Sequence, residues 1–153
     1  MTISSRGRYA LRVMIDLAEH CDGAYLPMKE VARRQDISLK YLEKIMPLLV
    51  ASKLVEGIHG KGGGYRLTRK AEQYTIGEIL RLTEGDLAPV ACLECNAQKC
   101  ERTADCRTLP MWSELNRRLN DYLDSVTIAD LMKKKSREVL FTGFPGIYFA
   151  SIS

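Results

Sequence analysis

A glycine-rich pattern typical of a β-hairpin occupies residues 53–68, which run Lys53-Leu54-Val55-Glu56-Gly57-Ile58-His59-Gly60-Lys61-Gly62-Gly63-Gly64-Tyr65-Arg66-Leu67-Thr68. We expect strands over residues 53–58 and 65–68, joined by a glycine turn. The turn is not a P-loop, because no Gly-Lys-Ser/Thr closes it at the required spacing. It is not a dinucleotide fingerprint either, because Tyr65 stands where the last glycine is expected. The function of the hairpin therefore has to be inferred from the elements around it.

Two helices are predicted immediately before the hairpin. Pro27 suits the first turn of one helix, and Ser38 is a good N-cap for the other. The predicted buried stripe of the second helix consists of Leu39, Leu42, Ile45, Met46, Leu49 and Val50. Two short helices joined by a tight turn and followed by a hairpin are typical of a helix-turn-helix with a wing. We favour this interpretation over a flexible hairpin that binds no partner. The glycines would let the backbone approach a groove closely.

Further helices complete the predicted head of the molecule. Apolar residues recur at helical spacing over about residues 5–20, and Thr75 with Glu78 forms a capping-box pattern that opens a helix through Leu82. We therefore expect a mostly α-helical protein in which residues 1–83 form a winged helix-turn-helix DNA-binding domain.

Four of the five cysteines lie in residues 92–106, at Cys92, Cys95, Cys100 and Cys106. No apolar period runs through this segment, so we predict a cysteine-rich loop over residues 84–109 that is held by a metal, an iron–sulfur cluster or disulfides. The sequence shows neither a signal-peptide pattern nor a stretch that could cross a membrane. We therefore expect a cytoplasmic protein with reduced thiols, which favours metal ligation or redox chemistry.

A long amphipathic helix is predicted after Pro110, within a segment of residues 110–136 that also holds a short following helix. Its apolar stripe consists of Trp112, Leu115, Leu119, Tyr122, Leu123 and Val126. The helix could pack on its own domain, but we favour burial of the stripe against a twin in a homodimer. The tail over residues 137–153 contains all three phenylalanines, and we assign it no role.

The charge distribution favours a polyanionic partner for the first half of the chain only. Residues 1–74 hold 13 basic and 8 acidic residues, whereas residues 75–132 hold 6 basic and 10 acidic residues. An enzyme is not expected, because the two histidines lie outside any nucleophile or metal motif and no nucleophile elbow is present.

Over about residues 1–135 the chain resembles the Rrf-two family of bacterial transcription regulators. The motifs that carry this resemblance are Ser5-Arg6-Gly7-Arg8-Tyr9-Ala10-Leu11-Arg12, Asp36-Ile37-Ser38-x-x-Tyr41-Leu42-Glu43, Gly60-x-Gly62-Gly63-Gly64-Tyr65-Arg66-Leu67 and Thr75-Ile76-Gly77-Glu78-Ile79, followed by the cysteines. The resemblance implies a dimer on a pseudo-palindromic operator of double-stranded DNA, with the second helix of the pair in the major groove and the wing in the minor groove. The DNA-contacting residues that it implies are Arg6, Ser38, Lys40, Tyr41, Glu43, Lys44, His59, Lys61, Gly62 and Arg66.

The resemblance also implies a cofactor. The spacing Cys92-x7-Cys100-x5-Cys106 is similar to that of the family's iron–sulfur members, so these thiols would hold a [2Fe-2S] or [4Fe-4S] cluster that is absent from an apo form. Cys95 is the candidate fourth ligand, since the positions that supply it in some relatives are Arg8, Arg12 and Leu109 here. Other members carry no cluster, which leaves a regulator controlled by thiol chemistry or by a partner as the alternative. A third hypothesis is that the loop binds a structural zinc ion and that the protein is an assembly adaptor.

Overall fold

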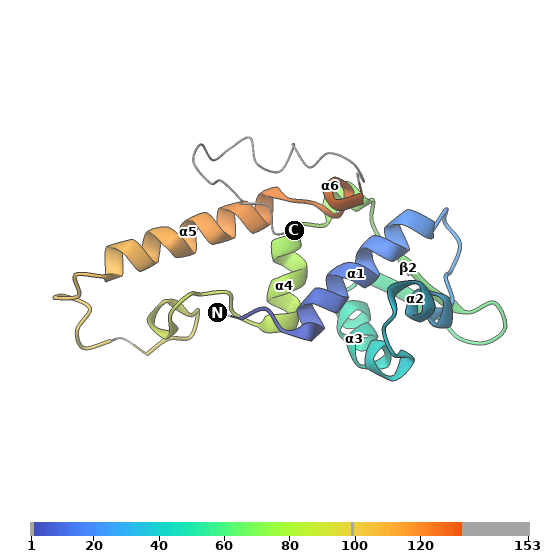
Figure 1. Cartoon of the computed structure of the whole chain (residues 1–153), viewed down its shortest axis with the longest axis horizontal. Coiled ribbons are helices and arrows are strands. Elements are labelled where there is room, and N and C mark those ends of the chain that lie inside the picture. The colour runs from blue at the N-terminus through green and yellow to red at the C-terminus, as the bar shows by residue number, and fades with distance from the viewer. Residues whose placement is uncertain (1, 99, 133–153) are drawn as a thin grey trace, which may run out of the picture.

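The computed structural model describes residues 2–98 and 100–132, and its regular structure is helical apart from one β-hairpin (Figure 1). The helices are α1 (Ser5–His20), α2 (Met28–Gln35), α3 (Leu39–Ala51), α4 (Ile76–Glu84), α5 (Leu109–Ser125) and α6 (Ile128–Met132). The strands are β1 (Val55–Ile58) and β2 (Gly64–Leu67), and short 3-10 helices are η1 (Ala71–Gln73) and η2 (Ala91–Leu93). The predicted tail over residues 137–153 lies outside the described residues.

Side-chain caps begin the helices where the sequence predicts them. The Ser38 hydroxyl accepts a hydrogen bond from the Tyr41 N–H at 3.2 Å, and the Thr75 hydroxyl accepts one from the Glu78 N–H at 3.1 Å. Ser4 caps α1 in the same way, and Pro27 directly precedes α2. These contacts lie within three residues of each cap, and this explains why local sequence sufficed to find them.

The hairpin is antiparallel; its first strand begins two residues later than predicted, and its second strand begins and ends one residue earlier. Val55 lies opposite Leu67 and Ile58 opposite Gly64, so Lys53 and Leu54 precede the strand. Leu26 and Tyr65 exchange two backbone hydrogen bonds of 2.9 Å, which attaches the chain before α2 to the outer edge of β2. A Cβ at Gly64 would lie 2.3 Å from the Leu26 carbonyl oxygen, so this glycine permits an internal backbone contact.

Helix α1 crosses the centre of the core and packs on α2, α4, α6 and β2 (Figure 1). Its buried stripe, Ala10, Val13, Met14 and Leu17, has no exposed surface. The predicted stripe of α3 is confirmed at Leu42, Ile45, Met46 and Leu49. Val50 departs from that prediction, because its side chain is 39% exposed at the last turn of the helix.

The end of α5 is joined to the core, and this divides the apolar stripe predicted for that helix. The Ile76 N–H donates to the Val126 carbonyl at 2.9 Å, and the Ile128 N–H donates to the Tyr74 carbonyl at 3.0 Å. Leu123 and Val126 consequently pack against the chain's own core. The stripe therefore serves an internal packing role at its C-terminal end, the alternative to the dimer contact that the sequence analysis favoured.

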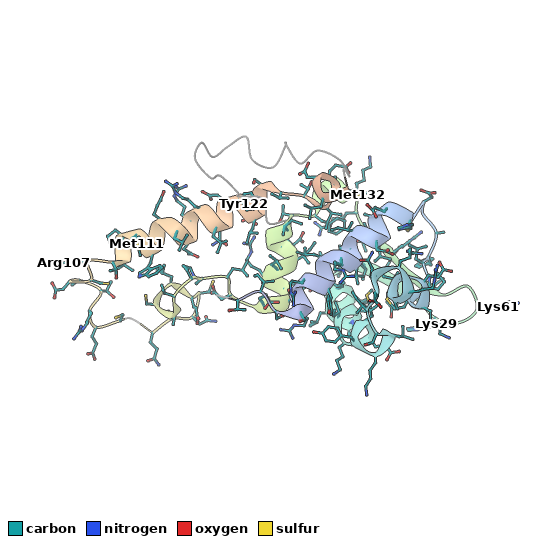
Figure 2. All side chains as sticks on the ribbon, in the orientation of Figure 1. Lys29, Lys61, Arg107, Met111, Tyr122 and Met132 are labelled. Atoms are coloured by element: carbon teal, nitrogen blue, oxygen red, sulfur yellow. The ribbon has the colours of Figure 1, made fainter. Side chains whose placement is uncertain are left out.

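The wing and the cysteine loop lie at opposite ends of the molecule. Lys61 marks the hairpin tip at one end of Figure 2, and Arg107, after the cysteines, marks the other. Helices α1 and α4 lie between them (Figure 1). Among the described residues, no helix has the length and apolar character needed to cross a bilayer.

Candidate nucleic-acid interface and cysteine loop

The predicted groove-reading face lies on the first turns of α3. Lys40, Glu43 and Lys44 are exposed there, and Ser38 is exposed while its hydroxyl caps the helix. Tyr41 is half-buried, because its ring makes an edge-to-face contact with the ring of Tyr9 on α1, with centroids 5.2 Å apart. The predicted residues of α3 are thus together on one surface, and one of them is also tied to α1.

The predicted wing residues divide into two groups. His59, Lys61 and Gly62 are exposed at the tip, where Gly62 has φ +80°. Arg66 instead pairs with Glu56 directly across the hairpin, donates to the Gly23 carbonyl at 3.0 Å and lies 4.5 Å from the Tyr25 ring centroid. The tip residues are available to DNA, whereas the Arg66 guanidinium is engaged at the base of the hairpin.

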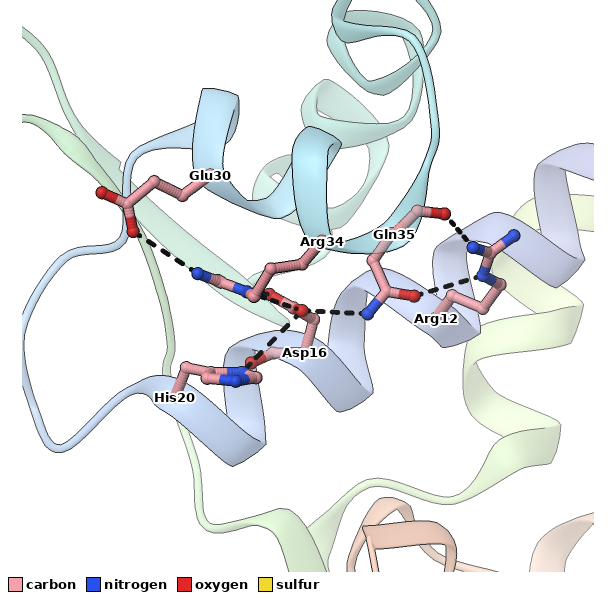
Figure 3. Close-up of polar contacts among 6 residues, drawn as sticks. All are labelled: Arg12, Asp16, His20, Glu30, Arg34 and Gln35. Carbon is pink, nitrogen blue, oxygen red and sulfur yellow. Dashed lines mark hydrogen bonds and ion pairs between the residues drawn. The ribbon is translucent and has the colours of Figure 1, made fainter.

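The structure contains a buried carboxylate between α1 and α2 that the sequence analysis did not predict. Asp16 of α1 has no exposed surface and binds Arg34 and Gln35 of α2 (Figure 3). Burial raises the pKa of Asp16, but the hydrogen bonds from Arg34 and Gln35, together with the charge of Arg34, outweigh it, so the pKa lies below its ordinary value. The signal available in the sequence was a charged residue between Val13 and Leu17 on the buried face of the first helix.

The four loop thiols are free and accessible. Cys92, Cys95 and Cys100 are exposed, and Cys106 is half-buried. The Thr108 hydroxyl lies 3.5 Å from the Cys106 Sγ and lowers the pKa of that thiol. The predicted loop is confirmed, since its regular backbone is limited to η2 in the described residues.

Asp86 attaches this loop to the end of α4. Its carboxylate accepts hydrogen bonds from the Cys95 N–H at 2.6 Å and the Ala88 N–H at 2.7 Å, and these lower its pKa. The neighbouring Asp86 carboxylate raises the pKa of the Cys95 thiol. Cys95 is therefore held by a protein carboxylate in this arrangement.

The cysteine loop fits an iron–sulfur cluster or zinc by donor chemistry, because thiolates are the ligands that both prefer. The positions of the ligands, however, do not form a site: in the part of the chain that the structure describes, no three Cys, His, Asp or Glu side chains are gathered as a metal site requires. The loop would have to close for three thiols to share one metal centre.

The C-terminal end of α4 joins three parts of the molecule. Glu84 accepts hydrogen bonds from the Ser4 N–H at 3.2 Å and from the Ser4 hydroxyl at 2.7 Å, which holds the start of α1. Arg81 donates to Asn120 of α5 at 2.8 Å and pairs with Asp124. Together with Asp86, these side chains connect the cysteine loop, α5 and α1 within one turn of helix and the residues that follow it.

Comparison with known proteins places the whole described chain in one group. Residues 3–134 match the family model of Rrf2, described as an iron-dependent transcriptional regulator. Protein rrf2 of Nitratidesulfovibrio vulgaris is 37% identical, over 89% of this chain and 90% of the relative. The HTH-type transcriptional regulator IscR of Vibrio campbellii is 34% identical, over 87% of this chain and 78% of the relative.

A solved structure agrees in fold. CymR, the global cysteine regulator of B. subtilis, superimposes with a TM-score of 0.72 at 32% identity, over 89% of this chain and 99% of CymR. The family description and the names of these relatives are those of transcription regulators rather than enzymes. The winged-helix fold expected from the sequence is thereby confirmed, and the chain belongs to the Rrf2 family of DNA-binding transcriptional regulators.

Proposed function

We propose that this regulator is a homodimeric repressor whose affinity for a pseudo-palindromic operator depends on an iron–sulfur cluster held by the cysteine loop. The observation that carries the proposal is the junction at the end of α4. Asp86 holds the loop at Cys95, and two residues earlier Glu84 holds the start of α1. We expect the protein to act in the cytoplasm, where the operator DNA lies.

Helix α3 is proposed to enter the major groove. The exposed side chains of Lys40 and Lys44 would contact phosphates, and the exposed carboxylate of Glu43 can accept a hydrogen bond from the cytosine amino group. Lys61 at the wing tip would contact the minor groove or its phosphates. Phosphate contacts supply affinity, and base contacts supply sequence preference.

The dimer is proposed to form along α5. Met111, Leu115 and Tyr122 are 53%, 46% and 48% exposed, although all three are large and apolar. At 100° per residue they lie within about 40° of one another on the helix surface. Trp112 and Leu119 lie next to them, both on one side, and are half-buried. An apolar stripe of this kind is suited to a symmetric contact with a second copy.

Cys92, Cys100 and Cys106 are the proposed cluster ligands, with Cys95 as the candidate fourth. When bound, the group would supply iron that responds to oxygen, redox state and nitric oxide. Ligation by Cys95 would act on the residue whose backbone N–H donates to Asp86. A change at Asp86 would then be passed through the end of α4 to Ser4 and α1.

A second function is supported by the accessible thiols. Because the described ligands are not gathered and CymR is among the structural neighbours, the loop could instead act as a thiol–disulfide switch without a cluster. DNA binding by the head would be the same in both versions.

Anaerobic purification followed by iron and sulfide counts tests the first version. We expect a coloured protein whose iron is lost in Cys92→Ser, Cys100→Ser and Cys106→Ser, and retained in the control Cys21→Ser, which lies outside the loop. Duplex binding is then measured with and without the cluster. A colourless protein in every preparation, with a reversible disulfide between loop cysteines, would replace this version with the thiol switch. Stoichiometric zinc and no duplex binding would overturn both.

A further inference from the structure

Asp16 lies at the centre of a polar cluster between α1 and α2 (Figure 3). The Arg34 Nε donates to its two carboxylate oxygens at 3.0 and 3.2 Å, and Arg34 Nη2 donates at 2.6 Å. The Gln35 amide donates to the same carboxylate at 2.9 Å. Asp16 has no exposed surface, so this carboxylate is satisfied entirely by groups of the protein.

Helix α2 has few apolar contacts that could fix its orientation. It has eight residues, and Val31 is its single fully buried side chain. Apolar contacts are non-directional, so Val31 and the partly buried Met28 and Ala32 fix the orientation of the helix less closely than hydrogen bonds do. A guanidinium fork on a carboxylate fixes both distance and angle. The contact between Arg34 and Asp16 is therefore one of the directional constraints between α2 and α1, together with the hydrogen bonds of Gln35.

The same cluster holds the turn that leads into α3. Arg12 of α1 donates to the Gln35 side-chain oxygen at 3.2 Å and also to the Gln35 carbonyl, an acceptor left open at the end of α2. The next residue, Asp36, has the left-handed values φ 51° and ψ 49°, and Ser38 then caps α3. Two residues thus separate the clamped Gln35 from the cap of the groove-reading helix.

We propose that Asp16 is a positioning residue for sequence recognition: through Arg34 and Gln35 it sets the orientation in which α3 meets the DNA. The inference rests on the proposed role of α3 in the major groove. Contacts to bases need placement of the helix to within a fraction of an ångström, whereas attraction to phosphates tolerates displacement. Loss of the Asp16 contacts should therefore reduce selectivity more than non-specific affinity.

The test uses the full-length protein. A duplex is first enriched from a random pool with the wild-type protein, and dissociation constants are measured for that duplex and for a scrambled duplex at several salt concentrations. In Asp16→Asn, which keeps the side-chain shape, we expect the ratio of the two constants to fall at least tenfold, with the scrambled-duplex constant and salt slope changed by less than twofold. Glu30→Gln is the matched control, because it removes only the exposed 3.4 Å contact to Arg34, and its ratio should equal that of the wild type.

Two further variants separate positioning from stability. Arg34→Lys keeps the charge and removes the fork, and it should lower the ratio by an intermediate amount. The double variant Asp16→Leu/Arg34→Met replaces the ion pair by apolar packing, which often restores stability. Circular dichroism at the assay temperature identifies the variants that are folded. A folded variant without the fork whose selectivity equals that of the wild type would overturn the role of Asp16, as would an equal loss on both duplexes. A wild-type protein that enriches no sequence would overturn the proposed function and this inference with it.

Discussion

The Glu84 carboxylate, at the end of α4, accepts two hydrogen bonds from Ser4, the residue that caps α1 and lies 80 positions earlier in the chain. The hydroxyl of Ser4 is meanwhile the acceptor for the Gly7 N–H at 3.3 Å. A Cβ on Gly7 would collide with the Glu84 Oε1, so any larger residue there would displace this carboxylate. The start of α1 is therefore fixed by a residue next to the cysteine loop.

Glu84→Gln should destabilise the protein by about 1 kcal/mol, because an amide has one acceptor oxygen where the carboxylate has two. If the junction transmits the state of the loop, the variant should also show a smaller difference in DNA affinity between the cluster-loaded and cluster-free protein. Urea unfolding and duplex titration measure the two effects. Glu72→Gln on the exposed side of η1 is the control. An unaltered affinity difference would show that the state of the loop is transmitted elsewhere.

The acid limb of the stability curve should contain a contribution from Asp16. Its pKa in the folded protein is below the ordinary value of 3.8, so its contribution is complete above that value and is lost as the pH falls through the folded pKa. We expect the free energy of unfolding of the wild type to exceed that of Asp16→Asn by roughly 2–4 kcal/mol near neutral pH. Breaking a buried ion pair is costly, and the partial exposure of Arg34 reduces that cost. Urea unfolding from pH 7 to pH 3 should show the gap closing below about pH 4. A gap that stays unchanged down to about pH 3 would contradict this assignment.

Leu115→Glu should shift the protein from dimer to monomer, because it places a charge in the middle of the exposed apolar stripe of α5. Light scattering coupled to size-exclusion chromatography measures the mass. Arg117→Gln, which removes exposed ion pairs on another face of α5, should leave the mass unchanged. A wild-type monomer at all concentrations would exclude the proposed interface.

Lys61→Ala and Arg66→Ala should have different consequences, although both cations belong to the hairpin. Lys61 is exposed at the tip, so its loss should weaken binding to all duplexes and lower the salt slope by about 1, with no change in melting temperature. Arg66 is bound to Glu56 and Gly23, so its loss should lower the melting temperature. Calorimetry together with salt-dependent binding distinguishes them. Identical behaviour of the two variants would refute this division.

Selectivity should depend on the face of α3. Glu43→Ala is expected to relax the preference for one base pair by about 1–3 kcal/mol, because its carboxylate would no longer accept from cytosine or exclude other bases. Binding to a panel of single-substitution duplexes measures this effect, and Glu72→Gln again serves as the control. A uniform change across the panel would indicate that Glu43 does not contact a base.

Much of the fold could be predicted because its signals are local. Ser38 and Thr75 cap helices through contacts three residues away, and the glycine turn separates two short strands. The cysteine loop was recognisable because no apolar period crosses it. The exposed positions of Lys40, Glu43 and Lys44 followed from the period of an α-helix.

Other features depend on residues that are distant in sequence. Arg66 and Lys61 are both basic residues of the hairpin, so the sequence treats them alike. Glu56 comes to lie opposite Arg66 only when the hairpin folds. Leu123 and Val126 share the stripe of Leu115, yet the bridge between residues 75 and 127 brings them to the core. No local pattern distinguishes these cases.

Short segments of the sequence determined the helix ends, the hairpin and the thiol-rich loop, because capping, periodicity and turn formation involve neighbours within a few residues. The burial of Asp16 beneath Arg34 and the attachment of Glu84 to Ser4 were decided by tertiary packing. Each of these depends on where two distant backbones meet, and the free energy of a buried charge is set by the partners it finds there.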